Sequence, residues 1–177
     1  DVGAHVGIFS LCAGVRVGPS GRVFAFEFGP DTAATLRSPD GFPPIAPPLE
    51  VIEKAVSDSD AGVTFYAYRA SMAASMARAN VETLNPEVRS EPARELSVES
   101  VTLDAFTAER GLRPDVIKID VEGAEFRVLQ GARRMLAGGS PLIFCEIHPQ
   151  QMQNVGGSVA ELLDFVASLG ETATPID

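Results

Sequence analysis

The sequence predicts an α/β fold built on a doubly wound, mostly parallel sheet, and three observations support this prediction. Segments of strand and helix character alternate along the 177 residues, which is typical of such folds. Several predicted strands are short, nearly continuous apolar runs, as expected for strands covered on both faces. A glycine-rich turn joins the first predicted strand to the first helix.

The first half of the chain contains strands separated by turns and short helices. Residues 1–7 read as a strand end and a tight turn, followed by a helix to about Val17 and a turn. Four further elements are predicted, namely a strand over 22–28, a helix over 31–36, and strands over 49–56 and 63–68 joined by a turn at 57–62. Residues 38–48 carry five of the 13 prolines, so a loop is predicted there.

The second half repeats the alternation after residues 69–96, which show no clear period and are predicted to be a long loop. The predicted elements are a helix over 101–110 with Thr102 as a possible cap, a strand over 115–120, an amphipathic helix over 125–136, a strand over 142–147 and a helix over 159–169. Residues 1–177 form a single predicted domain. We expect its first and final strands to be incomplete, with material missing at both ends, because the far edge of such a sheet needs a cover.

Composition excludes several classes of protein. The formal net charge of −10 disfavours binding to phosphate backbones, so no nucleic-acid partner is expected. No apolar run approaches the roughly 20 residues of a membrane-spanning helix, so no membrane partner is expected. Such a chain suits a cytoplasmic protein with small or neutral substrates. Cys12 and Cys145 stand in apolar surroundings and are predicted to be buried, reduced thiols.

The first candidate site is the run Asp1-Val2-Gly3-Ala4-His5-Val6-Gly7. Glycines let the backbone approach a ligand closely, and Asp1 could accept a hydrogen bond from a ligand hydroxyl or ammonium. The spacing is G-x-x-x-G rather than the G-x-G-x-x-G of dinucleotide binders, which argues against a nicotinamide-dependent oxidoreductase. The alternative is a turn that serves packing alone.

Two further positions suit a nucleoside. Glu27 ends the next strand, where an acidic residue fits the two hydroxyls of a ribose; its alternative is a solvated strand-end carboxylate. Ser57 and Asp58 follow the third strand, where an adenine amino group would be reached. Ordinary turn chemistry is the alternative for these two residues.

Acidic residues then gather at the end of the strand over 115–120. Asp120, Glu122 and Glu125 follow it, and Glu146 and His148 end the next strand. In open α/β sheets, ligands bind at the carboxyl ends of strands, and a histidine there could act as a base. The acids could instead complement a helix dipole, which explains Glu125 well. His148 could equally be a strand-end residue hydrogen-bonded to a carboxylate.

Together these motifs resemble the FkbM family of methyltransferases. The matching runs are DVGAHVG, GRVFAFE, AVSD, VTLDAF, PDVIKIDVEGAEFRVLQGARRML and PLIFCEIH, between Asp1 and His148. The resemblance implies the Rossmann-like class I methyltransferase fold, S-adenosyl-L-methionine as cofactor, and O-methylation of hydroxyls on sugars, polyketides or related small metabolites.

The resemblance also implies roles for individual residues. Asp1, Gly3, Ala4 and Gly7 match the first cofactor loop, Glu27 the acid that holds the ribose, Asp58 the position near adenine, and Asp120, Glu122 and Gly123 the central acidic motif. Two positions depart from the family pattern. His5 stands where asparagine is usual, and Phe28, which could stack on adenine, stands where proline is usual.

Methyl transfer to a hydroxyl gains from a base that takes the hydroxyl proton. Asp120 and His148 are the candidates for this base, and Glu122 could hold the substrate or the amino group of the cofactor. A divalent ion between Asp120 and Glu122 is chemically possible, but nothing in the spacing demands it and no metal is predicted. The alternative to an enzyme is a non-catalytic relative that binds the cofactor and acts through protein contacts. The sequence does not indicate the oligomeric state.

Overall fold

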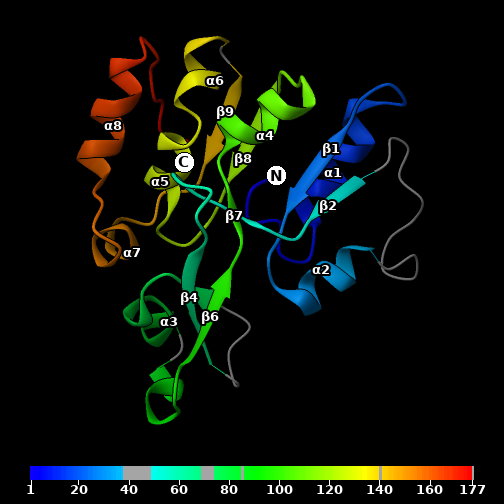
Figure 1. Ribbon diagram of the computed structural model, residues 1–177. Coiled ribbons are helices and arrows are strands. Elements are labelled where there is room, and N and C mark those ends of the chain that lie inside the picture. Colours follow the sequence, from blue (N-terminus) through cyan, green and yellow to red (C-terminus); the bar gives the residue numbers. More distant parts are fainter. Residues whose placement is uncertain (38–48, 69–73, 85, 140, 177) are drawn as a thin grey trace.

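The computed structural model describes residues 1–37, 49–68, 74–84, 86–139 and 141–176 (Figure 1). The helices are α1 (Ile8–Val17), α2 (Pro30–Arg37), α3 (Arg78–Leu84), the 3₁₀ helix η1 (Pro86–Ser90), α4 (Leu103–Arg110), α5 (Glu125–Gln130), α6 (Arg133–Ala137), α7 (Pro149–Asn154) and α8 (Val159–Ser168). The strands are β1 (Val23–Phe26), β2 (Leu49–Ile52), β3 (Ala55–Val56), β4 (Val63–Ala67), β5 (Ala74–Ser75), β6 (Arg94–Val98), β7 (Ser100–Val101), β8 (Val116–Ile119) and β9 (Leu142–Cys145). The prediction of an α/β fold with parallel strands is confirmed.

Two parallel strand pairs meet at the N-terminal residues. β1 pairs with β2 and β8 with β9, both in parallel. Val2 forms one parallel bridge to Phe26 and another to Ile119. The order across the sheet is therefore β2, β1, Val2, β8, β9, and the carboxyl ends of β1 and β8 lie on either side of the predicted glycine-rich turn. β3 and β7 form a separate small parallel pair.

Apolar residues of these strands pack against helices α4 and α5. Ile117, Ile119 and Phe26 belong to the largest buried cluster, together with Val128 of α5 and Phe106 of α4. The ring of Phe106 meets that of Phe26 edge-on, with 4.8 Å between the ring centroids. Burial of this apolar surface is the main stabilising contribution to the arrangement.

The structure corrects the prediction for residues 69–96. Their described part contains β5, α3, η1 and β6, and β4 pairs antiparallel with both β5 and β6. Figure 1 shows this ribbon, with α3 beside it, extending away from the parallel strands. The predicted strand over 49–56 is divided into β2 and β3, whose partners are different strands. The loop predicted over 38–48 lies outside the described residues.

The helix predicted over 125–136 is interrupted at Gly131. A Cβ atom there would lie 2.1 Å from the carbonyl oxygen of Ser57, and the Gly131 carbonyl accepts the Asp104 amide at 2.8 Å. The Asp104 carboxylate accepts the Arg134 amide at 3.0 Å and the Met135 amide at 2.7 Å, so it caps a new helix, α6. The predicted helix over 101–110 is confirmed as α4, with the Thr102 hydroxyl accepting the Ala105 amide at 3.1 Å.

Both cysteines are free thiols, but the prediction that both are buried is wrong. Cys12 lies on α1 and is exposed. Cys145 is half-buried at the end of β9, where burial, followed by the charges of Glu125 and Asp120, raises the pKa of its thiol to about 12. Among the described residues, no helix is long and apolar enough to cross a membrane.

The close approach at Gly131 predicts a stability effect. Gly131→Ala is expected to lower the free energy of unfolding by about 1–3 kcal/mol, because the new methyl group overlaps a backbone oxygen that cannot rotate away. Gly138→Ala is the control, since its Cβ would lie 3.4 Å from the nearest carbonyl oxygen, that of Arg134. Urea denaturation of both variants measures the difference. Equal stability of the two would contradict the packing argument.

Candidate functional site

The N-terminal loop has the backbone that its glycines predict. Gly3 has a φ of +76°, and a Cβ atom on it would lie 1.9 Å from the carbonyl oxygen of Asp120. His5 and Gly7 also have positive φ values, +50° and +87°, and α1 begins directly after Gly7. Ala4 is buried beneath the loop. The loop therefore turns sharply from the sheet into the helix and lies against the end of β8.

Glu27 reaches the same loop from β1. Its Oε2 accepts the His5 amide at 2.8 Å, and its Oε1 accepts the Gly29 amide at 2.7 Å. The structure thus brings Glu27 and the glycine-rich loop together. The ring of the next residue, Phe28, packs against that of Phe65, with centroids 4.2 Å apart. Phe28 therefore already contacts an aromatic side chain of β4.

Lys118 joins the two acids that flank Gly3. Its Nζ lies 3.3 Å from Asp1 Oδ1 and 3.4 Å from Asp120 Oδ2, and it donates to the Gly3 carbonyl at 2.9 Å. The Lys118 side chain is only 16% exposed, so these contacts compensate a charge that has lost most of its water. Sequence reasoning missed Lys118, although a lysine inside an otherwise apolar strand was a usable signal.

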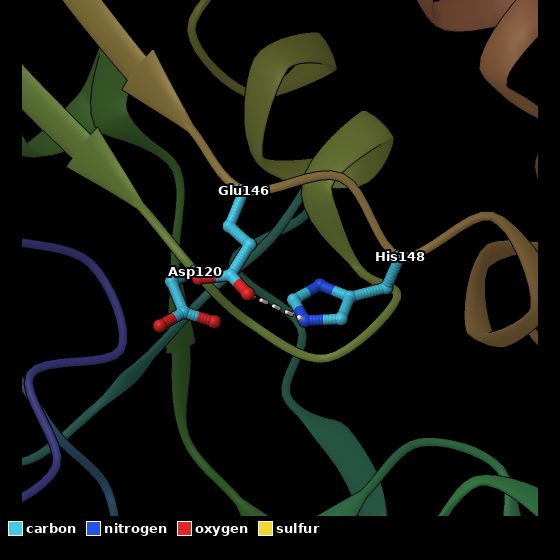
Figure 2. A group of neighbouring side chains, drawn as sticks. All are labelled: Asp120, Glu146 and His148. Atoms are coloured by element: carbon cyan, nitrogen blue, oxygen red, sulfur yellow. Dashed lines mark ion pairs between the residues drawn. The ribbon is translucent and has the colours of Figure 1, made fainter. Parts of the chain in front are cut away.

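Asp120 and His148 lie close together because β8 and β9 are parallel neighbours. Figure 2 shows Asp120, Glu146 and His148 converging from the ends of these strands, and their ligand-type atoms all lie within 4.8 Å of one another. His148 Nε2 is 3.6 Å from both Glu122 Oε2 and Glu146 Oε1. The pairing of these strands thus brings Asp120 and His148 together, but β9 ends at Cys145 and His148 instead precedes α7.

Glu125 is the residue of this cluster whose role the sequence did not reveal. Its side chain is 0% exposed, and its Oε1 contacts His148 Nδ1 at 2.8 Å and accepts the Gly123 amide at 2.9 Å. The helix-dipole explanation of Glu125 is therefore incomplete. The carboxylate does begin α5, but it also lies directly behind the histidine ring.

Charges within this cluster shift its proton equilibria. Burial lowers the pKa of His148, but the Glu125 hydrogen bond and the charges of Glu122, Glu125 and Asp120 outweigh it, so the pKa is raised overall. The pKa of Glu122 is also raised, first by burial and then by Asp120 and other acids, against the opposing effect of His148. His148 and Glu122 therefore both bind a proton more readily than the same side chains do in water.

Asn80, which lies in the segment predicted to be a long loop, holds the backbone of Glu122 in place. Glu122 has a φ of +53°, and its carbonyl accepts from Asn80 Nδ2 at 3.1 Å. Asn80 is fully buried and also donates to Ser75 Oγ at 2.8 Å, while Asn154 of α7 donates to Asn80 Oδ1 at 2.8 Å. The segment between β4 and β6 therefore fixes the backbone of the acidic loop after β8, residues 120–125, through the buried side-chain amide of Asn80.

Ser57 and Asp58 make local contacts. Ser57 is buried and its hydroxyl donates to Asp58 Oδ1 at 2.9 Å. The same carboxylate oxygen lies 3.5 Å from Arg127 Nη1 of α5. These contacts tie the end of β3 to α5, and the place of the two residues near adenine stays a prediction.

A hollow of the surface lies at the other end of the same strands. It is lined by residues that include Asp115, just before β8, and Pro141, just before β9. The converging acids and His148 follow the carboxyl ends of these strands. The hollow is therefore separate from the cluster, which is where the chemistry-bearing side chains meet.

Comparison with known proteins agrees with the motifs and their geometry. The family model described as the methyltransferase FkbM domain matches residues 1–172. No curated protein and no solved structure matches the chain. The family match spans the glycine-rich loop, Glu27, the acidic loop after β8 and His148, so this chain belongs to the FkbM family of methyltransferases.

Proposed function

We propose that this protein transfers a methyl group from S-adenosyl-L-methionine to a hydroxyl of a small metabolite such as a sugar or polyketide. The observation that carries the proposal is that the loop of Gly3, Glu27 and the Asp120–His148 cluster all lie at the carboxyl ends of parallel strands. Val2 pairs on one side with β1, the next strand in the chain, and on the other side with β8, which comes in the second half of the chain. This order is what a doubly wound, Rossmann-like sheet has at its ligand-binding switch point.

The residues around the loop fit the proposed cofactor. Asp1 Oδ1 is buried, makes no hydrogen bond among the described residues and faces the Lys118 ammonium at 3.3 Å, so it keeps lone pairs for the ammonium of the cofactor. Gly3 and Gly7 let the backbone pass close to a ligand. Glu27 holds one backbone amide with each oxygen and keeps lone pairs for ribose hydroxyls. In this proposal Ala4, His5, Phe28, Ser57 and Asp58 complete the cofactor contacts.

When bound, S-adenosyl-L-methionine supplies an electrophilic methyl group. The protein's own tasks are to align the acceptor oxygen with it and to remove the hydroxyl proton. His148 is better placed than Asp120 to take that proton, because the Lys118 ammonium already shares the Asp120 carboxylate at 3.4 Å. Bound S-adenosyl-L-methionine would give up its methyl group to the acceptor oxygen as the sulfur–methyl bond breaks and S-adenosylhomocysteine leaves, and His148 Nε2 would take the hydroxyl proton. Asp120 and Glu122 then orient the acceptor.

Cofactor binding is the first test of this proposal. Calorimetric titration with S-adenosylhomocysteine is expected to show micromolar binding, and Glu27→Ala is expected to weaken it by about 10- to 100-fold, since hydrogen bonds to a charged group are lost. Glu109→Ala, which removes an exposed acid from α4, is the matched control. Circular dichroism checks that both variants are folded. Absence of binding to the folded wild-type protein would refute the proposed function.

The base assignment predicts a loss of turnover without a loss of cofactor. His148→Ala is expected to lower kcat by about 10²–10⁴-fold, the contribution of a positioned general base, while S-adenosylhomocysteine affinity is retained. Production of S-adenosylhomocysteine with a panel of sugar and polyketide hydroxyls measures turnover. A fully active His148→Ala variant would move the base elsewhere, and Asp120→Asn is the variant to compare. Binding without any turnover would favour a non-catalytic relative.

The proposed mechanism needs no metal ion. Turnover is therefore expected to persist in EDTA, because a histidine base and positioned carboxylates suffice to remove the proton. The same assay with and without EDTA, followed by addition of Mg²⁺ or Mn²⁺, measures this. Activity that EDTA abolishes and Mg²⁺ restores would instead place a divalent cation among Asp120, Glu146 and His148.

A further inference from the structure

We propose that Glu125 is a positioning residue that fixes His148 in the tautomer with Nδ1 protonated and Nε2 free to accept the proton of the methyl acceptor. The catalytic part of this inference rests on the proposed function. The tautomer itself does not, because it follows from the contacts around the ring. Glu125 touches neither acceptor nor cofactor in this scheme and acts only through His148.

The hydrogen bonds at Glu125 Oε1 determine which ring nitrogen carries the hydrogen. The Gly123 amide, which can only donate, lies 2.9 Å from this oxygen. Glu125 as a carboxylate has no hydrogen to give, so His148 Nδ1 at 2.8 Å donates to this oxygen. A neutral imidazole carries one hydrogen, so Nε2 is left with its lone pair. The fully buried Glu125 side chain has no access to water that could replace this bond.

The free nitrogen faces the acidic side of the cluster. Glu122 Oε2 and Glu146 Oε1 both lie 3.6 Å from Nε2, beyond the length of a normal hydrogen bond. Nε2 is thus left for a group that enters between these carboxylates. Once the ring takes a proton, the surrounding charges of Asp120, Glu122, Glu125 and Glu146 stabilise the imidazolium.

The backbone sets the distance between Glu125 and His148. Gly123 has a φ of +108°, and a Cβ atom on it would lie 2.7 Å from Gln151 of α7. The turn before Glu125 therefore packs directly on the helix that follows His148. Such packing holds both partners to one spacing, as a positioned base requires.

Nuclear magnetic resonance tests the tautomer without any need for turnover. The chain has only two histidines, His5 and His148, so ¹⁵N-histidine labelling gives two rings and His5→Asn assigns them. In the wild-type protein above the titration range, His148 is expected to show Nδ1 protonated and Nε2 unprotonated. A ring protonated at Nε2, or an even mixture of the two tautomers, would overturn the proposal.

Variants then test the effect of Glu125 on catalysis. Glu125→Gln keeps the shape but removes the charge, and kcat is expected to fall by about 10- to 100-fold, a part of what a general base supplies. The lower limb of the pH–rate profile should also move to lower pH, because the imidazolium loses a stabilising charge. Glu109→Gln is the matched control, since it removes the charge of an exposed acid on α4 and should leave kcat and the pH profile unchanged.

The outcomes separate this inference from the proposed function. If Glu125→Gln does not fold, Glu125→Asp keeps the charge, and kcat is expected to be partly preserved. A folded Glu125→Gln protein with unchanged kcat and pH profile would overturn the positioning role, even where His148→Ala is inactive. Failure of the wild-type protein to bind S-adenosylhomocysteine would refute the proposed function, while the tautomer measurement would still decide the role of Glu125.

Discussion

The insertion of Val2 between β1 and β8 is the constraint on which the site depends. The Val2 amide donates to the Lys118 carbonyl at 2.9 Å, and the Val2 carbonyl accepts the Asp120 amide at 3.1 Å. The Phe26 amide donates to the Asp1 carbonyl at 2.9 Å. These bonds fix the register of three chain segments, so the turn after Val2 and the acid after β8 must face each other. The near contact of Gly3 with Asp120 follows from this register, and it explains why a side chain cannot stand at Gly3.

A site with this many acids requires positive charge close by, and the chain supplies it at two places. Lys118 lies between Asp1 and Asp120, which lowers the cost of burying them. His148 serves the second group, with Glu125 behind the ring. The two differ chemically, because histidine is the side chain that exchanges its proton near neutral pH. In the proposed function, the first group orients ligands and the second group takes part in proton transfer.

Local sequence patterns predicted the parts of the site that depend on strand ends. Apolar runs located β8 and β9, and their adjacency as parallel strands was enough to bring Asp120 near His148. Features set by tertiary contact were not predictable in this way. The break at Gly131 depends on the Ser57 carbonyl, which no helical period encodes. Asn80 lies in a segment without a clear period, and Glu125 already had a sufficient local explanation as the first residue of a helix.

In the proposed function, the acids around His148 have opposing effects on its use as a base. They raise the pKa of the ring, so a smaller fraction is neutral at a given pH, and only the neutral ring accepts a proton. A higher pKa also makes the neutral ring a stronger base, which favours proton transfer. The balance is best when the pKa lies close to the working pH, and burial restrains the rise by disfavouring the imidazolium. The carboxylates thus make the neutral ring a stronger base while they lower its population, and an exposed strand-end histidine without these neighbours would lack the first effect.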